Sequence, residues 1–157
     1  MAEISNLKII FDLLLATGLG ALIGIEREWA KKDPGLRTFS FVSLGSALFM
    51  ILGKLVIFKI GIGTYDPSRI LGQIIVGIGF LGAGIIIFNP KEQRFKGLTT
   101  ASMLWVTAAI GSAVGLGCYE IALVTALIMI IMNAFIRPIE IKLDKKIDEI
   151  KEKKKID

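Results

Sequence analysis

The chain has 157 residues, of which 54% are hydrophobic, with a formal net charge of +5 and a mean hydropathy of +0.69. Its length suits a single domain, and few soluble domains are so apolar. The sequence contains no histidine, which removes the usual general base and zinc ligand, and its single cysteine, Cys118, excludes a disulfide framework within the chain.

Five long apolar runs predict an all-α integral membrane protein. A helix formed by each run would extend roughly 28 Å, which is close to the thickness of the bilayer core. We therefore predict a bundle of five transmembrane helices within residues 1–137 and a basic amphipathic cytoplasmic tail over residues 138–157. The runs, in chain order, are Leu7–Ile25, Phe39–Phe58, Ile70–Phe88, Leu98–Gly117 and Tyr119–Ile136.

The basic residues predict the orientation of the bundle. Most of the 19 Lys and Arg residues follow the first, third and fifth runs. Because positive loops stay in the cytoplasm, we expect the N-terminus outside and the C-terminus in the cytoplasm of a bacterial inner (plasma) membrane. The basic excess then indicates anchoring to the inner leaflet rather than nucleic-acid binding. The tail is expected either to lie on that leaflet or to pair with its copy in a dimer.

Within the first two runs, ionisable residues at membrane depth are candidate functional groups. Asp12 and Lys54 are expected at similar depth near the outer surface, so they form a candidate intramembrane pair. The alternative is that the Lys54 side chain extends to the outer surface.

The segment between the first two runs carries a second group of charges. Glu26-Arg27-Glu28 ends the first helix, and Arg37 begins the second. These side chains are expected to pair with one another at the membrane rim. Alternatively, Glu26 faces inward and binds a hard cation, since Mg²⁺ prefers oxygen ligands and often needs only one or two carboxylates.

Before the third run, Asp66-Pro67 predicts a helix start, with Asp66 as the N-cap and Pro67 at the first helical position. That role leaves Arg69 and Gln73 unexplained, because both would project into the outer part of the bundle. Asp66 is a second candidate ligand for a cation.

The stretch Gly77–Gly84 contains the G-x-G-x-x-G pattern of dinucleotide-binding turns, but it lies inside an apolar run and no acidic residue follows at the required distance. We read its glycines as helix-packing positions, since small residues mark contact faces in membranes; glycine also permits backbone carbonyls to face an ion path. The first, third and fourth helices are expected to pack together through such faces, the fifth to face lipid, and one glycine face to form a homo-oligomer, with a dimer favoured. The proposed packing glycines are Gly20, Gly24, Gly77, Gly79, Gly82, Gly84, Gly111 and Gly115.

Six motifs, in this order, resemble the MgtC/SapB family of bacterial inner-membrane proteins over about residues 8–136. The resemblance implies a link to growth at low magnesium, and action on other membrane proteins such as ATP synthase. It also implies a short, SapB-like member without the soluble ACT-like domain of longer members, and a functional polar motif at Glu26, Arg27, Arg37, Asp66, Arg69 and Gln73. The motifs lie at 24–29, 35–38, 66–74, 77–84, 96–101 and 104–111.

We therefore expect a non-enzymatic protein of magnesium homeostasis that regulates or assists other membrane proteins. The alternative is an oligomeric transporter or channel for Mg²⁺ or another small solute, with the outer and inner polar groups as its two gates. An enzyme and a resident cofactor are not expected, and Mg²⁺ is the candidate ligand, at Glu26 and Asp66.

Overall fold

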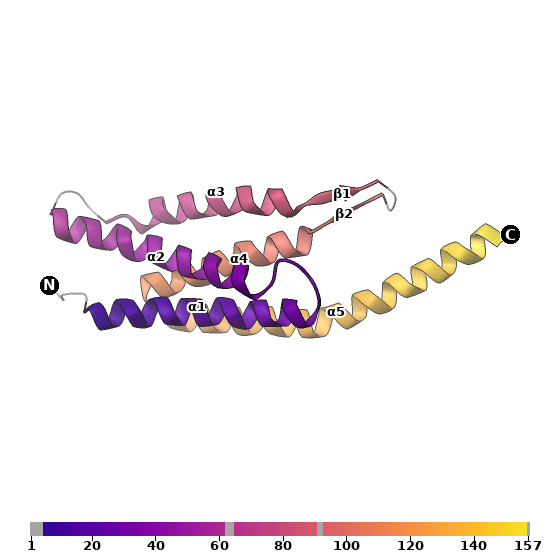
Figure 1. The fold of residues 1–157 in the computed structure, drawn as a ribbon, viewed down its shortest axis with the longest axis horizontal. Helices are drawn as coiled ribbons and strands as arrows, with labels where there is room; N and C mark the ends of the chain where they lie inside the picture. Colours follow the sequence, from indigo (N-terminus) through magenta and orange to yellow (C-terminus); the bar gives the residue numbers. More distant parts are fainter. Residues whose placement is uncertain (1–4, 62–64, 91–92, 157) are drawn as a thin grey trace.

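The computed structural model describes residues 5–61, 65–90 and 93–156, and within them five helices lie side by side (Figure 1). Each contains a stretch long and apolar enough to cross a membrane, which confirms the predicted all-α integral membrane bundle. The orientation of the bundle in the membrane stays a prediction. The helices are α1 (Asn6–Trp29), α2 (Leu36–Ile60), α3 (Pro67–Ile85), α4 (Leu98–Leu116) and α5 (Tyr119–Ile156).

Successive helices run in opposite directions, so the bundle has two distinct ends (Figure 1). The N-terminal end holds the starts of α1, α3 and α5 and the ends of α2 and α4. The hairpin end holds the opposite termini together with a short β-hairpin. The helix α5 continues past this end without interruption to Ile156, so residues 138–156 extend a membrane helix instead of forming a separate one.

The hairpin between α3 and α4 was not predicted. It pairs β1 (Ile87–Asn89) with β2 (Arg94–Lys96) in antiparallel register, with Phe88 opposite Phe95. The prediction that the third helix continues to Phe88 is therefore wrong, because α3 ends at Ile85. Consecutive β-branched residues at 85–87 favour a strand, and the Asn-Pro dipeptide that follows favours a turn.

Gly97 joins the hairpin to α4 with a backbone that other residues rarely adopt. Its φ of +91° lies in the left-handed region, and a Cβ at this position would collide with the backbone carbonyl of Ile85. Only glycine combines this conformation with so close an approach to α3. Gly97 thus fixes the start of α4 beside the last turn of α3.

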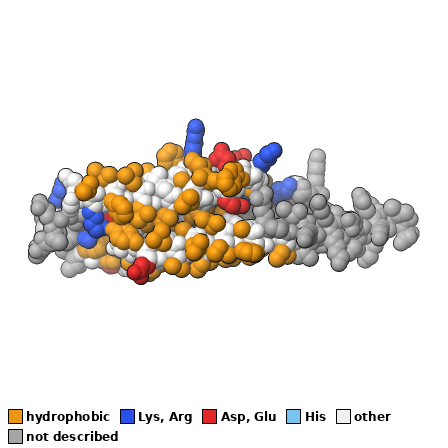
Figure 2. Space-filling view, turned by 90° about the horizontal axis from the view of Figure 1, so that it is seen from below, with side chains coloured by type: hydrophobic (Ala, Val, Ile, Leu, Met, Phe, Trp, Pro, Cys, Tyr) orange, Lys and Arg blue, Asp and Glu red, His pale blue; other side chains and the backbone are white. Residues whose placement is uncertain are grey.

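The core of the bundle lies between α1, α2 and α4. The most extensive helix contacts are those of α2 with α1 and with α4, and α4 is the most buried of the five spans. Phe39, Ile23 and Leu104 are among the largest fully buried side chains. Outside this core, hydrophobic side chains cover most of the visible middle of the bundle (Figure 2), as expected for a surface in contact with lipid.

Four of the proposed packing glycines lie directly against the backbone of α2. A Cβ on Gly20 would come within 2.5 Å of the Phe39 carbonyl oxygen, and one on Gly115 within 2.7 Å of the Ala47 carbonyl oxygen. Gly24 and Gly111 lie equally close to Leu36 and Ser43. These glycines of α1 and α4 therefore allow close backbone approach to α2, a helix that the sequence did not assign to the packed group.

The glycines of α3 behave differently. Gly82 lies in ordinary contact with Ala101 of α4, with a Cβ separation of 3.5 Å. Gly77, Gly79 and Gly84 have no atom of the described chain within 4 Å of where a Cβ would stand. The expectation that α3 packs tightly within the chain through these three glycines is wrong, and α3 is the least buried of the five spans.

Candidate functional site

A buried polar cluster at the hairpin end joins α1 and α4. Arg27 lies in the last turn of α1, and its side chain is turned inward, leaving the residue 5% exposed. Its Nη2 donates a hydrogen bond of 2.7 Å to the hydroxyl of Thr100 in the first turn of α4. A cation in the last turn of a helix also interacts favourably with the helix dipole.

Glu26 extends this cluster to α5. The side-chain amide of Asn133 donates a 3.3 Å hydrogen bond to Oε2 of Glu26 and lies 3.5 Å from the sulfur of Met103. Neighbouring residues of α1 thus contact two different helices. We call Glu26, Arg27, Thr100, Met103 and Asn133 the Glu26–Arg27 cluster. It ties three spans together at one depth, where polar contacts between helices are stabilising.

The other predicted residue of this end lies apart from the cluster. Arg37 is exposed at the start of α2. Glu28 has a role that the sequence did not assign, because its Oε2 accepts a 3.3 Å hydrogen bond from the amide of Leu36. Glu28 thereby satisfies one of the amides left open at the start of α2, where the N-cap residue, Gly35, has no side chain to do so.

At the N-terminal end, Asp66 acts as predicted and caps α3. Its Oδ1 accepts hydrogen bonds from the amide of Ser68 at 3.0 Å and from the hydroxyl of Ser68 at 2.6 Å. The hydrogen bond from the Ser68 hydroxyl, aided by the amide and the nearby charge of Arg69, lowers the pKa of Asp66 below its ordinary value. Arg69 and Gln73 are both exposed on the first two turns of α3.

The two candidate metal ligands, Glu26 and Asp66, are separate sites, as the sequence predicts. Glu26 is in the last turn of α1 and Asp66 precedes the first turn of α3, so they lie at opposite ends of the bundle. Each carboxylate is engaged by the hydrogen bonds described above. Within residues 5–61, 65–90 and 93–156, no three acidic or cysteine side chains come together in a way that could hold a metal ion. Binding of Mg²⁺ by Glu26 or by Asp66 alone, with water completing the coordination, stays a prediction.

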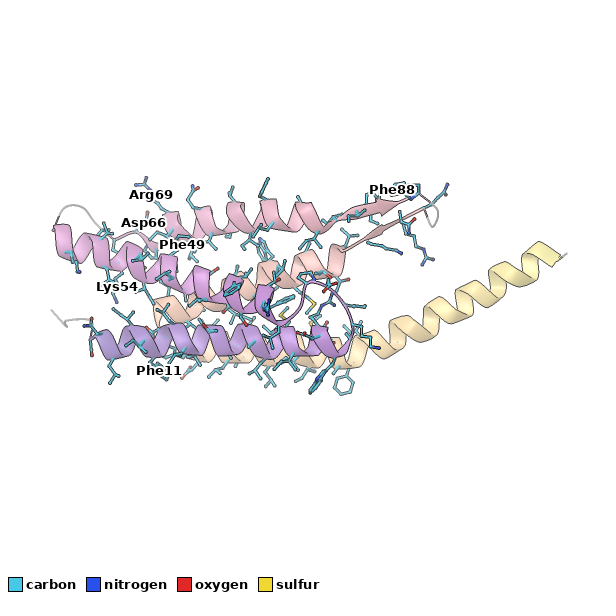
Figure 3. All side chains as sticks on the ribbon, in the orientation of Figure 1. Phe11, Phe49, Lys54, Asp66, Arg69 and Phe88 are labelled. Atoms are coloured by element: carbon cyan, nitrogen blue, oxygen red, sulfur yellow. The ribbon has the colours of Figure 1, made fainter. Side chains whose placement is uncertain are left out.

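Asp12 is buried but does not pair with Lys54. Its carboxylate forms a 2.8 Å salt bridge with the ammonium of Lys8, one helical turn earlier. It also accepts a 2.7 Å hydrogen bond from the hydroxyl of Tyr119. Lys8 and Tyr119 are themselves 2.6 Å apart, Nζ to hydroxyl. Lys54 extends from the side of α2 away from α3 (Figure 3). The candidate Asp12–Lys54 pair is thus replaced by a triad that joins α1 to the start of α5.

One of the contacts of Asp12 could have been predicted from the sequence. The spacing of four between Lys8 and Asp12 is the spacing of side chains that meet on one helical face, and it could have identified the pair. Tyr119 and Asn133 could not have been found in this way. Their partners on α1 are both 107 positions away, and only the packing of α5 against α1 brings them together.

A large groove lies between α2 and α3. Its volume is about 1010 Å³, and most of its lining is apolar. Phe49 projects from α2 toward this space, and Arg69 extends outward from the start of α3 (Figure 3). Arg69 and Gln73 line the part of the groove near the N-terminal end, and Thr38 lies near the other. We call this feature the α2–α3 groove.

Comparison with known proteins places the chain in a family. The sequence pattern of the MgtC family matches residues 13–142. Protein MgtC of Salmonella typhimurium is 41% identical over 128 residues, which cover 82% of this chain and 52% of the relative. The Escherichia coli K12 protein named "Putative magnesium transporter YhiD" is 43% identical over 122 residues, covering 74% of this chain and 54% of the relative.

A third relative, the protein slr0014 of Synechocystis, is 38% identical over 129 residues, which cover 81% of this chain and 51% of the relative. The chain thus spans about half the length of the curated relatives it matches. No solved structure matches it. The family match covers most of the five-helix bundle, including the Glu26–Arg27 cluster and the α2–α3 groove. The chain is therefore a multi-pass membrane protein that belongs to the MgtC family.

Proposed function

We propose that this protein serves magnesium homeostasis as a non-enzymatic regulator or accessory that binds other membrane proteins. The link to magnesium comes from the name of the Escherichia coli relative and from the family resemblance. Because the chain matches only about half the length of these relatives, their activities are carried over here as a proposal. We place the protein in the bacterial inner membrane with its C-terminus in the cytoplasm, on the distribution of its basic residues.

The observation that carries the proposal is an open face of small residues on α3. Gly72, Gly79 and Ala83 recur at spacings of seven and four, so they lie on one side of the helix, and all three are exposed. No described atom lies within 4 Å of a Cβ built at Gly72 or Gly79. Val76, on the same side, is 68% exposed.

This face matches the composition of membrane contact surfaces elsewhere in the chain. Four glycines of α1 and α4 lie against the backbone of α2, whereas Gly72 and Gly79 of α3 meet no helix of the described chain. Small residues let two helices approach closely and gain van der Waals contact, which drives helix association in lipid. The open face therefore suits a transmembrane helix of another protein.

Two leucine substitutions test this role against a matched control. Gly79→Leu and Ala83→Leu would block close approach of a partner helix without touching the bundle core. Gly18→Leu, on the open side of α1, adds the same side chain to another glycine with no neighbour within 4 Å. In a strain lacking the gene, growth at low magnesium should be lost with the α3 variants and retained with Gly18→Leu. Normal growth with both α3 variants would refute the proposed contact face.

A flux measurement separates regulation from transport. Purified protein in liposomes loaded with a magnesium-sensitive dye should show no magnesium entry. Saturable entry that is abolished by Glu26→Gln would instead establish the transporter alternative and assign the inner carboxylate to its path. The folded state of each variant is checked by its thermal unfolding in detergent.

A further inference from the structure

The α2–α3 groove has the dimensions of a site for one lipid chain. Along α3 its lining extends from Arg69 to Leu81. Twelve residues of helix correspond to about 18 Å, slightly more than the roughly 15 Å of hydrocarbon in one leaflet. An acyl chain that starts at the level of Arg69 would therefore fill most of the part lined by α3; along α2 the lining is longer, from Thr38 to Val56, or about 27 Å.

The walls of the groove are apolar and exposed where a chain would lie. Phe49 and Leu52 of α2 are 60% and 44% exposed, and Leu81 of α3 is 50% exposed. Gly45 and Gly77 widen the groove, since neither has a described atom within 4 Å of a Cβ position. An elongated hydrocarbon can enter this space without displacing a side chain.

The mouth of the groove carries a positive charge. Among the described residues, Arg69 is the only charged one in its lining. In the part of the chain that the structure describes, the Arg69 guanidinium has no hydrogen-bond or ion-pair partner within 4.0 Å. The Asp66 carboxylate accepts hydrogen bonds from Ser68 and interacts with the Arg69 guanidinium only through a longer-range charge attraction. Gln73, one turn farther along α3, adds a side-chain amide on the same lining. Guanidinium groups bind phosphate oxygens with two parallel hydrogen bonds, so this mouth is complementary to a phospholipid headgroup.

A second hollow in the surface also has a cation in its lining, but that cation already has a partner. It lies beside the first turns of α1 and is lined by Leu7, Phe11 and Leu14 together with Lys8. The ammonium of Lys8, however, is held by Asp12 and Tyr119. Lys8 is therefore held in a direct ion pair, whereas within the described residues the Arg69 guanidinium forms no direct hydrogen bond or ion pair and its hydrogen-bond donors are available to a ligand.

We propose that the α2–α3 groove binds one phospholipid, with an acyl chain between α2 and α3 and the phosphate on Arg69, and that it prefers a net anionic headgroup such as phosphatidylglycerol. A zwitterionic headgroup brings its own ammonium close to the guanidinium, which weakens the attraction. This site uses the side of α3 that faces α2, whereas Gly79 and Ala83 lie on the outward side. The groove lining is thus distinct from Gly79 and Ala83, while Arg69, three positions before Gly72, borders both surfaces.

The test counts lipids bound to the purified full chain by native mass spectrometry. The protein in detergent is titrated with dioleoyl phosphatidylglycerol and, separately, with dioleoyl phosphatidylcholine. Wild-type protein should bind one phosphatidylglycerol in preference to phosphatidylcholine. Arg69→Gln should reduce this preference roughly tenfold, as expected when one charge-assisted contact is lost, while Arg69→Lys should retain part of it.

Control variants separate the headgroup contact from the chain contact. Gly45→Leu fills the groove and should weaken the binding of both lipids. Lys59→Gln removes another exposed cation at the same end of the bundle, and Gly18→Leu adds a leucine outside the groove; both should bind as wild type does. An unchanged preference in Arg69→Gln, or unchanged binding in Gly45→Leu, would overturn the proposal.

A second copy of the chain is the competing occupant, and a cross-link detects it. Gly77→Cys in a Cys118→Ser background places the one thiol in the groove. In lipid nanodiscs containing phosphatidylglycerol, an oxidant should leave this variant monomeric if lipid fills the groove. Efficient disulfide-linked dimers would show that a second chain occupies it, and would overturn the lipid assignment.

Discussion

The guanidinium of Arg27 donates to the hydroxyl of Thr100 across 2.7 Å, and this contact ties the last turn of α1 to the first turn of α4. Both side chains are buried, at 5% and 6% exposure. A buried guanidinium that loses an acceptor retains its desolvation cost, so the two residues depend on each other.

Thr100→Val should therefore destabilise the bundle by about 1–2 kcal/mol, since valine keeps the shape of threonine and removes the acceptor. The measurement is the free energy of unfolding in mixed detergent micelles. Thr99→Val is the matched control, because Thr99 is exposed beside it. A double-mutant cycle with Arg27→Met would show a coupling energy near zero if the hydrogen bond contributed nothing.

The Lys8–Asp12–Tyr119 triad gives a second prediction. Tyr119→Phe removes the hydroxyl that donates to the buried Asp12 carboxylate, and should cost about 1 kcal/mol of unfolding free energy. Lys8→Gln should lower the thermal midpoint, because it leaves that carboxylate without its cation. Lys54→Gln should leave the midpoint unchanged. An equal loss in both lysine variants would mean that Lys54, rather than Lys8 alone, balances Asp12.

Two glycines that lie in similar small-residue spacings should differ in how substitution by alanine changes the stability of the protein. A methyl group on Gly111 would collide with the backbone of Ser43, so Gly111→Ala should destabilise the protein by about 1–3 kcal/mol. At Gly79 the added methyl meets open space, and Gly79→Ala should be neutral or stabilise the helix by up to about 1 kcal/mol. Thermal unfolding of the two variants decides this. Similar destabilisation of both would place a packing partner on Gly79 within the purified protein.

These glycines show how far the sequence predicts this fold. Hydropathy alone was sufficient for the five spans, because a helix that crosses lipid must be long and apolar. The spacing of small residues indicated contact faces on α1, α3 and α4. It could not indicate which helix each face meets. On α2 the spacing Ser43-x-x-x-Ala47, which meets Gly111 and Gly115, was overlooked because it contains no glycine.

For the polar residues too, contacts between neighbours in sequence were predictable, and contacts between helices were not. The cap at Asp66 was predictable, because its partner is Ser68, two positions away. Local spacing also relates Lys8 to Asp12. The contacts of Glu26 with Asn133 and of Arg27 with Thr100 depend on helix packing, so only the residues of α1 were predictable, not their partners. The hairpin was missed because its first strand, Ile87–Asn89, is only three residues long and begins inside the apolar run that also forms α3.

The cap of α3 should make stability depend on pH in a specific way. Since the pKa of Asp66 is lower in the folded protein than its ordinary value of 3.8, the folded state favours the ionised carboxylate. This contribution is complete above the unfolded pKa, and it is lost as the pH falls through the folded pKa. Protonation weakens the two hydrogen bonds from Ser68 and removes a negative charge from the positive end of the helix dipole.

The measurement compares thermal midpoints of the wild type, Asp66→Ala and Asp66→Asn between pH 7 and pH 2.5. Near pH 7 the wild type should unfold at a higher temperature than Asp66→Ala, and this difference should shrink at acid pH. Asparagine also caps a helix but does not titrate in this range, so the midpoint of Asp66→Asn relative to Asp66→Ala should stay constant. Every other carboxylate is common to the three proteins, so the comparison isolates Asp66. An advantage of the wild type over Asp66→Ala that persists unchanged at pH 2.5 would mean that the cap does not depend on the charge of Asp66.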